Sequence, residues 1–197
     1  SEYGDILRVE TTGASEHTPF VCSGVSGVEA SNRLAERDLT EVLMFRDMIV
    51  SVGNTRCETC SSLSLVSCRL SIRPALIAAI ISRQSRAGID LNRDGYGATD
   101  PDCFGLMQVR AATGGGGGGG GRREGGVTFF IQLCKTMKRT KPRWNREQQL
   151  KAALACYVAG EERVIPLAYD ELDSVTPYGD FANDVVARAQ WFALHGF

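Results

Sequence analysis

The stretch that most constrains the fold is residues 74–88, which read PALIAAIISRQSRAG. Pro74 suits the first turn of a helix, and Gly88 suits a left-handed cap at its end. Between them, residues 75–81 are apolar on every face, which predicts a short helix that is buried all round. Polar residues at 82–86 follow without an apolar break. Such a helix can hold a site against a cleft, although a simple exit from the core explains the same pattern.

The composition is that of an ordinary globular protein. The 197 residues are 43% hydrophobic and 23% charged, with a formal net charge of −1. This length suits one domain over residues 1–197, and the charge gives no field that would attract nucleic acid or an anionic membrane. No apolar run approaches the roughly 20 residues of a membrane span. We therefore expect no nucleic-acid partner and no membrane partner.

The cysteines and acids do not predict a metal site. Seven cysteines allow at most three disulfides and leave one thiol. The single Cys57-x-x-Cys60 has neither a second pair nor a nearby histidine, which argues against zinc. The acids between Asp90 and Asp102 do not follow the register of a calcium loop. The first residues show neither a basic nor an apolar segment, so we expect no signal peptide in this chain.

The first half of the chain predicts an irregular arm over residues 1–28 and a helix over residues 29–52 that ends at Gly53. We expect the charged side of that helix to be a solvated face (Glu36, Arg37, Asp38, Glu41, Arg46 and Asp47). Residues 90–102 have turn chemistry, and residues 103–109 read as a half-buried strand or a short extended run.

The second half contains a glycine run and further helices. Eight consecutive glycines at 114–121 predict a flexible surface loop within residues 111–126, since ordering glycine costs the most backbone entropy. Helices are predicted over residues 127–138, over 149–159 behind an N-cap box at 145–148, and over 181–194 starting after Asp180 or at Asn183; residues 161–169 add a broken turn. The chain thus has five or six helices around a turn-rich hairpin region, an α+β fold that is mostly α.

Several segments of the chain resemble goose-type lysozymes. The segment IISRQSRAG at residues 80–88 is similar to the one that carries their catalytic acid. Four further segments agree in order along the chain: YGD with TTGAS (3–5 and 11–15), LAERD (34–38), FGLMQV (104–109) and FANDVVARAQ (181–190). The resemblance covers nearly the whole chain. It implies the lysozyme-like fold, with helices around a buried central helix and a small turn-rich β region.

The resemblance also implies an activity and a location. It implies antibacterial hydrolysis of the β-1,4 bond between N-acetylmuramic acid and N-acetylglucosamine in peptidoglycan, with inversion, no metal and no cofactor. It further implies a secreted, extracellular monomer whose partner is bacterial peptidoglycan or a chito-oligosaccharide.

The position of the family's catalytic glutamate is occupied by Gln84, whose amide has no proton to donate. Of the water-positioning carboxylates, Asp100 is the best match before the FGLMQ segment, with Asp102 as an alternative. The aspartate after that segment is replaced by Arg110, and the family's Tyr-Asn pair becomes Tyr157-Val158. The resemblance places the remaining substrate-binding residues at two positions of the extended run (Phe104 and Gln108) and at Tyr157.

No other residue clearly replaces the missing acid. Glu124 lies beyond the glycine run, Glu161 and Glu162 begin a different element, and both histidines lie near the termini (His17 and His195). Two functions remain open: a lysozyme weakly active through Asp100 and substrate binding, or a non-catalytic module that binds peptidoglycan or chitin fragments. A third explanation is that the glycine run and the missing acid are alterations of the sequence.

Overall fold

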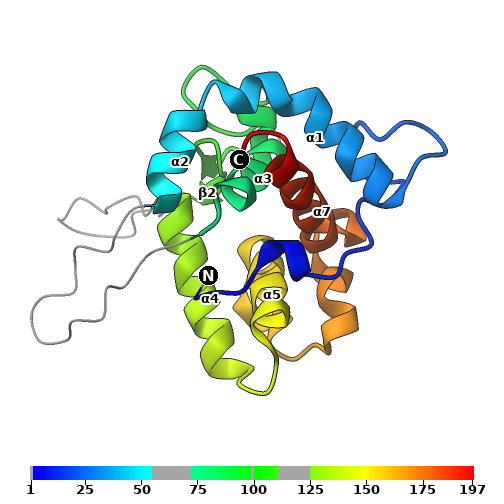
Figure 1. Ribbon diagram of the computed structural model, residues 1–197, viewed down its shortest axis with the longest axis vertical. Coiled ribbons are helices and arrows are strands. Elements are labelled where there is room, and N and C mark those ends of the chain that lie inside the picture. The colour runs from blue at the N-terminus through cyan, green and yellow to red at the C-terminus, as the bar shows by residue number, and fades with distance from the viewer. Residues whose placement is uncertain (1, 55–71, 99, 111–124) are drawn as a thin grey trace, which may run out of the picture.

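The computed structural model describes residues 2–54, 72–98, 100–110 and 125–197 (Figure 1). Within these ranges the chain is mostly helical with one small antiparallel sheet, which confirms the predicted mostly-α class. The α-helices are α1 (Gly27–Leu43), α2 (Arg46–Asn54), α3 (Pro74–Ser85), α4 (Gly126–Thr140), α5 (Arg146–Ala159), α6 (Glu161–Val164) and α7 (Phe181–Leu194). Short 3-10 helices occur at η1 (Ile6–Arg8), η2 (Arg86–Gly88), η3 (Tyr169–Val175) and η4 (Pro177–Gly179). Strands β1 (Cys103–Phe104) and β2 (Val109–Arg110) form a hairpin that pairs Cys103 with Arg110.

Helix α3 is the buried helix that the sequence predicts. Pro74 lies in its first turn, and residues 75–82 are all buried. Each fully buried Ile or Leu contributes about 1.5–3 kcal/mol relative to an exposed one, so this stretch anchors the core. The prediction that Gly88 caps the helix is wrong: the left-handed cap is Arg86, with φ at 49°. The Ser85 hydroxyl accepts the Gly88 N–H at 3.1 Å and turns the chain away from the helix.

The single helix predicted over residues 29–52 is also wrong, because the chain breaks into α1 and α2 at Met44 and Phe45. The N–H of Met44 bonds back to the last turn of α1 and ends that helix. Helix α2 ends at Asn54, one residue beyond the predicted stop at Gly53. A Cβ at Gly53 would lie 2.8 Å from the carbonyl oxygen of Ile72, so glycine allows the segment before α3 to approach closely.

The helices of the C-terminal half follow the prediction closely. The capping box of α5 is present: the Asn145 side chain accepts the Gln148 N–H at 2.7 Å, and the Gln148 side chain accepts the Asn145 N–H at 3.0 Å. Helix α7 begins after Asp180, one of the two predicted starts, but its first turn is capped by Asp173. The Asp173 carboxylate accepts two backbone N–H groups of α7, each at 2.8 Å. Helix α4 buries most of its predicted face (Phe130, Ile131, Cys134 and Met137).

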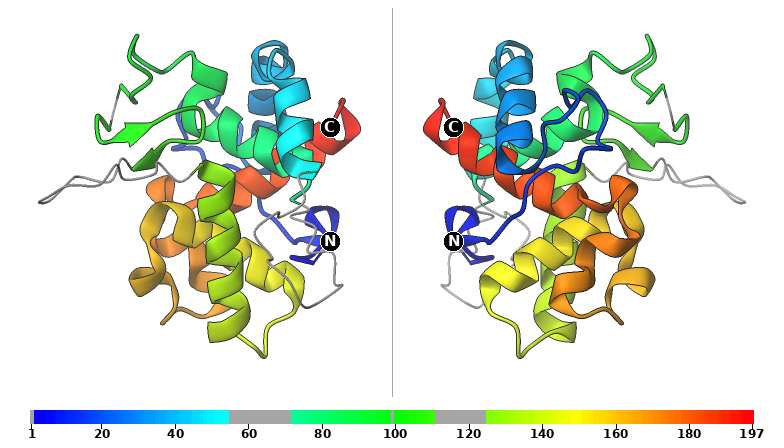
Figure 2. Two further views of the ribbon diagram at one scale, coloured as in Figure 1. Left: turned by 90° about the vertical axis from the view of Figure 1, so that its left-hand side faces the viewer. Right: turned by 90° about the vertical axis from the view of Figure 1, so that its right-hand side faces the viewer.

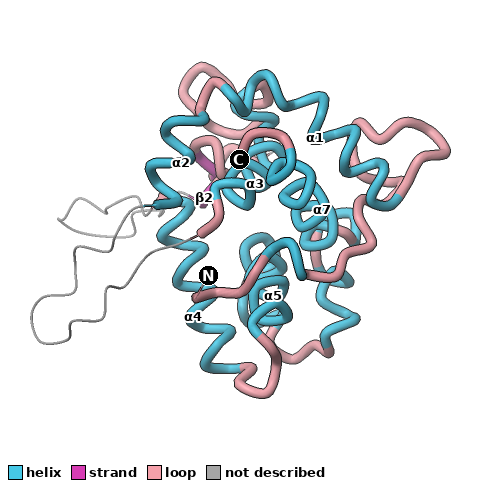
Figure 3. Tube along the Cα trace, viewed as in Figure 1, coloured by secondary structure: helices cyan, strands magenta, loops and turns pink. Residues whose placement is uncertain are grey.

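The elements form two groups of helices around α3 and α7. Helix α3 packs along α7, with α1 and α2 also against it (Figure 1). Helices α4 and α5 pack on each other and lie together in a second group (Figures 2 and 3). The hairpin lies beside the first turn of α4. A Cβ at Gly126 would lie only 2.6 Å from the Met107 side chain, so the glycine allows this close contact. No described helix is long and apolar enough to cross a membrane.

The N-terminal arm is tied to α7. The Thr11 hydroxyl donates to the Asn183 carbonyl at 2.5 Å, and the Gln190 amide donates to the carbonyls of Ile6 and Val9. Residues 111–124 of the predicted glycine-rich loop lie outside the described residues, as does the cysteine-rich segment at 55–71.

Candidate active site

A cleft of about 1870 Å³ runs past the end of α3, the hairpin and the first turns of α4. It brings together residues that are far apart in the sequence, including five of the six predicted site residues: Gln84, Asp100, Phe104, Gln108 and Tyr157. Asp102, the sixth, does not line it. The cleft therefore collects the predicted site into one concave surface, the usual location of a ligand site.

Gln84 lies in the last turn of α3 and is partly buried. Among the described residues, none forms a hydrogen bond with its side chain amide. Because burial of α3 fixes the backbone on both sides of Gln84, the amide is held at the wall of the cleft. A neutral amide at this position can donate and accept hydrogen bonds, but it cannot supply a proton.

Asp100 is held as a carboxylate by its neighbours. The N–H of Asp102 donates to Oδ1 at 3.0 Å, and the Cys103 thiol donates to Oδ2 at 3.3 Å. The bond from Asp102, followed by the bond from Cys103, lowers the pKa of Asp100. Burial and the same bond raise the pKa of Cys103 to about 11, so the thiol stays protonated as the donor. Asp102 thus contributes its backbone N–H to Asp100.

Arg110 faces Asp100 across the hairpin. Its Nη2 lies 3.7 Å from Asp100 Oδ2, and its side chain is 73% exposed. The register of β1 and β2 explains this contact. Arg110 is paired with Cys103 across the hairpin, and the Cys103 thiol donates to Asp100. This edge of the cleft therefore carries an ion pair of opposite charges and not two carboxylates.

The turn between β1 and β2 is fixed from two sides. The Ser85 hydroxyl donates to the Leu106 carbonyl at 2.8 Å, and the Tyr157 hydroxyl donates to the Met107 carbonyl at 2.7 Å. Burial raises the pKa of Tyr157, so its hydroxyl stays protonated. The hydroxyl of this predicted substrate-binding residue is therefore engaged within the protein. Sequence reasoning missed Ser85, whose partner is distant in the chain.

Gln108 and Phe104 are held in the hairpin by close packing. Gln108 has φ at 48° and donates to the Gly105 carbonyl at 2.7 Å. A Cβ at Gly97 would lie 2.1 Å from Gln108 Oε1, so the glycine leaves room for that side chain. The Phe104 ring packs edge-on against Tyr96, with centroids 5.1 Å apart.

Comparison with known proteins identifies the family. The family model for lysozyme g matches residues 3–196. The chain belongs to the lysozyme g family. It is similar to lysozyme g of Struthio camelus, at 38% identity over 99% of this chain and 89% of the relative. It is also similar to lysozyme g of Epinephelus coioides (40%, with 96% of each chain covered) and to lysozyme g-like protein 2 of Mus musculus (34%, covering 99% of this chain and 81% of the relative).

Membership in the lysozyme g family supports a peptidoglycan-hydrolase-like function, and the cleft is the candidate for its site. Inverting glycosidases need a carboxylic acid that protonates the leaving oxygen and a carboxylate that activates water on the opposite face. The cleft of this family member contains Asp100, but Gln84 and Arg110 are not carboxylic acids.

A buried network of charges supports the floor of the cleft. Asp184 accepts hydrogen bonds from Arg83 and from Arg188, whose Nη2 lies 2.8 Å away. Burial alone would raise the pKa of Asp184, but the charges of Arg188 and Arg83 outweigh it and lower the pKa. Asp38 accepts the Ser82 hydroxyl at 2.8 Å. These bonds connect α1, α3 and α7 directly beside Gln84.

The network corrects one prediction. Asp38 was expected on a solvated face of α1, yet it is completely buried. Its carboxylate accepts two hydrogen bonds from Arg37, at 2.8 and 3.1 Å, and lies 3.6 Å from Arg188. Arg37 lies beside it on α1, but Arg188 and Ser82 come from α7 and α3, so the helical pattern of α1 alone could not reveal its burial.

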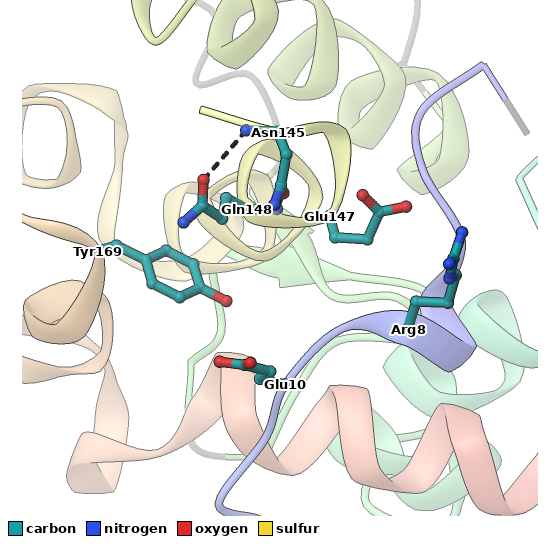
Figure 4. Close-up of a pocket in the computed structure, with 6 residues that line it drawn as sticks. All are labelled: Arg8, Glu10, Asn145, Glu147, Gln148 and Tyr169. Atoms are coloured by element: carbon teal, nitrogen blue, oxygen red, sulfur yellow. Dashed lines mark hydrogen bonds between the residues drawn. The ribbon is translucent and has the colours of Figure 1, made fainter. Parts of the chain in front are cut away.

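A second, smaller pocket of about 370 Å³ shares no residue with the cleft (Figure 4). Its polar side chains mostly have structural partners: Asn145 and Gln148 form the capping box of α5, and Glu147 accepts the Asp5 N–H at 3.0 Å. Arg8, Glu10 and Tyr169 complete its lining. This pocket is not a candidate for the glycosidase site.

The remaining cysteines, histidines and glutamates named from the sequence give no replacement for the acid among the described residues. The described cysteines are free thiols (Cys22, Cys103, Cys134 and Cys156). His17 is exposed beside Glu16, and His195 stacks on the Trp191 ring at 3.7 Å. Glu161 and Glu162 begin α6, and Glu124 lies outside the described residues.

Proposed function

We propose that this protein binds bacterial peptidoglycan in the cleft and hydrolyses its β-1,4 bonds poorly, because Gln84 occupies the position of the general acid. The observation that carries the proposal is the location of Gln84 at the wall of the cleft, on the buried helix that the family uses for its acid. The protein would act outside the cell as a monomer, as the family resemblance implies, and without a cofactor.

The expected loss follows from general acid catalysis. Protonation of the leaving group by a positioned side chain is typically worth 10²–10⁴-fold in rate, or roughly 3–5 kcal/mol of barrier. Asp100 does not replace the acid, because its lowered pKa keeps it ionised near neutral pH. Asp100 can still orient a water molecule, which supports residual activity.

Arg110 is a second reason for low turnover. A cation 3.7 Å from Asp100 weakens that carboxylate as a base, since an opposite charge stabilises the ionised form. Restoring the acid at residue 84 alone would then recover only part of the activity.

The second candidate function is a non-catalytic binding protein for peptidoglycan or chito-oligosaccharide. It is favoured by the same amide at residue 84, because a neutral group in a preserved cleft can bind a sugar without reacting. The two functions make the same contacts and differ only in whether the bond breaks.

A wall-clearing assay tests the proposal. The parent chain, Gln84→Glu and the control Gln132→Glu, an exposed position on α4 outside the cleft, are added to purified peptidoglycan at equal concentration. We expect Gln84→Glu to clear walls roughly 10²-fold faster than the parent, and the control to match the parent. A parent as fast as Gln84→Glu would refute the missing-acid explanation.

Sedimentation with insoluble peptidoglycan separates the two candidate functions. A parent that sediments with walls and releases no reducing sugar is a binding protein. A parent that sediments and releases sugar slowly is the impaired enzyme. A parent that neither sediments nor releases sugar would contradict both.

A further inference from the structure

Two short turns with the same sequence pattern border the cleft. Residues 18–20 and residues 176–178 both read Thr-Pro-aromatic, ending in Phe20 and Tyr178. Each turn is closed by a backbone hydrogen bond from the residue after the aromatic to the threonine carbonyl, at 3.2 and 3.1 Å. All three residues of the first turn line the cleft, as do the proline and tyrosine of the second.

Both aromatic residues have a left-handed backbone, with φ at 68° for Phe20 and 61° for Tyr178. In a turn of this kind proline occupies the second position, and the third position has a positive φ. That third position normally takes glycine or asparagine. A bulky side chain with positive φ is uncommon, and such conformations concentrate at ligand sites. The packing of the ring does not explain the choice, because Phe20 is 61% exposed and Tyr178 is 53% exposed.

Each exposed ring is backed by arginine. The guanidinium carbons of Arg37 and Arg86 both lie 4.8 Å from the Phe20 ring centre, and that of Arg83 lies 5.8 Å from the Tyr178 ring centre. Arg37 and Arg86 also both contact the buried Asp38, which restrains the two guanidinium groups beside the Phe20 ring. Cation–π contacts of this kind restrain a ring, and both aromatic residues remain more than half exposed.

The two turns are joined to each other. The Ser15 hydroxyl donates to the Tyr178 carbonyl at 3.1 Å, and the Thr18 hydroxyl donates to Asp180. Arg83, which bonds to Asp180 and contacts the Tyr178 ring, directly precedes Gln84. The two turns therefore share hydrogen-bonding partners with Arg83, the residue next to Gln84 on α3.

We infer that Phe20 and Tyr178 form a sugar-binding subsite next to Gln84, in which the apolar C–H faces of N-acetylhexosamine rings stack on the two aromatic rings. Exposed aromatic surface gains free energy when it leaves water, and a pyranose presents a flat apolar face of matching size. The left-handed turns and the arginines hold the rings in place before binding, which reduces the ordering cost. The inference rests on the proposed function, since it needs an oligosaccharide in the cleft.

Isothermal titration with the β-1,4 hexamer of N-acetylglucosamine tests the subsite. The variants are Phe20→Ala and Tyr178→Ala, with Phe20→Tyr and Tyr178→Phe as ring-retaining partners. Met44→Ala is the control, since Met44 is 79% exposed and does not line the cleft. We expect each alanine variant to bind roughly tenfold more weakly, and the ring-retaining variants and the control to bind within about twofold of the parent.

A second measurement avoids any folding defect of the variants. The aromatic NMR signals of Phe20 and Tyr178 in the parent chain, assigned with the ring-retaining variants, should shift during titration with the hexamer. A parent that binds the hexamer while these signals stay fixed, or alanine variants that bind as tightly as the parent, would overturn the subsite and leave the proposed function intact. A parent that binds neither the hexamer nor peptidoglycan would overturn both.

Discussion

Asp184 joins two arginines of the buried charge network, Arg83 and Arg188, so Asp184→Asn tests how the cleft floor is held. The substitution keeps the side chain's shape and removes one buried negative charge between Arg83 and Arg188. Breaking a buried pair by removing one partner typically costs about 3–5 kcal/mol. Arg83 retains Asp180 and Arg188 retains Ser82, so we expect the lower end, about 3 kcal/mol. For a chain of this size that corresponds to a fall in Tm of roughly 6–12 °C.

The stability difference between the parent and Asp184→Asn should also depend on pH, which gives a second, independent test. The folded-state pKa of Asp184 is lowered, so its contribution to stability is present above its unfolded pKa of about 3.9 and is lost as the pH falls through the folded value. Thermal unfolding of the parent and the variant should therefore differ most near pH 7, and the gap should narrow below about pH 4. Asp94→Asn, at an exposed loop position, is the matched control. A Tm of Asp184→Asn within 2 °C of the control near pH 7, or a gap that stays constant on acidification, would refute the reasoning.

Three further predictions concern parts of the fold that hold the cleft. Tyr157→Phe leaves the buried Met107 carbonyl without its donor, so urea unfolding should show a loss of about 1–3 kcal/mol, and hexamer binding should weaken as the hairpin loosens. Alkylation by iodoacetamide near pH 7 should be slow at Cys103 and Cys156, because burial raises their pKa values to about 11 and about 12; rapid labelling of either in the native protein would contradict this. Asn145→Ala removes the capping box of α5 and should cost about 0.5–2 kcal/mol by urea unfolding, whereas Asn92→Ala would report on the turn at residues 92–96 instead.

The local parts of the fold could be predicted from sequence. The apolar run of α3 and the box at Asn145 and Gln148 depend only on residues within a few positions of one another. The failures have tertiary causes. Asp38 was assigned to solvent because its partners Ser82 and Arg188 come from other helices. The close approach of Gly53 to the Ile72 carbonyl could not be predicted, because the two residues are far apart in the sequence.

The sequence predicted which residues line the candidate site better than it predicted the contacts that hold them. The resemblance gave positions that the structure gathers in one cleft, but not the bonds that fix them, such as Ser85 to Leu106 and Tyr157 to Met107. The repeated Thr-Pro-aromatic pattern is present in the sequence at residues 18–20 and 176–178. Its meaning depends on a positive φ at Phe20 and Tyr178, which the pattern alone does not predict for aromatic residues.

The charge balance around residue 84 decides how an introduced glutamate would titrate. Arg83 and Arg86 flank the position in sequence and would lower the pKa of a neighbouring carboxyl if their charges were free. They are not free: Arg83 is paired with Asp180 and Asp184, and Arg86 faces Asp38 and Asp90. Partial burial should then dominate and raise the pKa of a glutamate at residue 84 above its usual value of about 4.3.

The pH profile of wall clearing by Gln84→Glu tests this balance. A general acid works below its pKa, so the rate should fall as the pH rises through about 5–6. Adding Asp184→Asn releases positive charge beside the site, which should lower the acid's pKa and move the falling limb to lower pH. A falling limb at the same pH in both variants, with both folded at the assay temperature, would mean that the buried network holds the position of residue 84 without tuning its charge. The network would then be only a scaffold, and the acidity of the site would depend on the cleft surface alone.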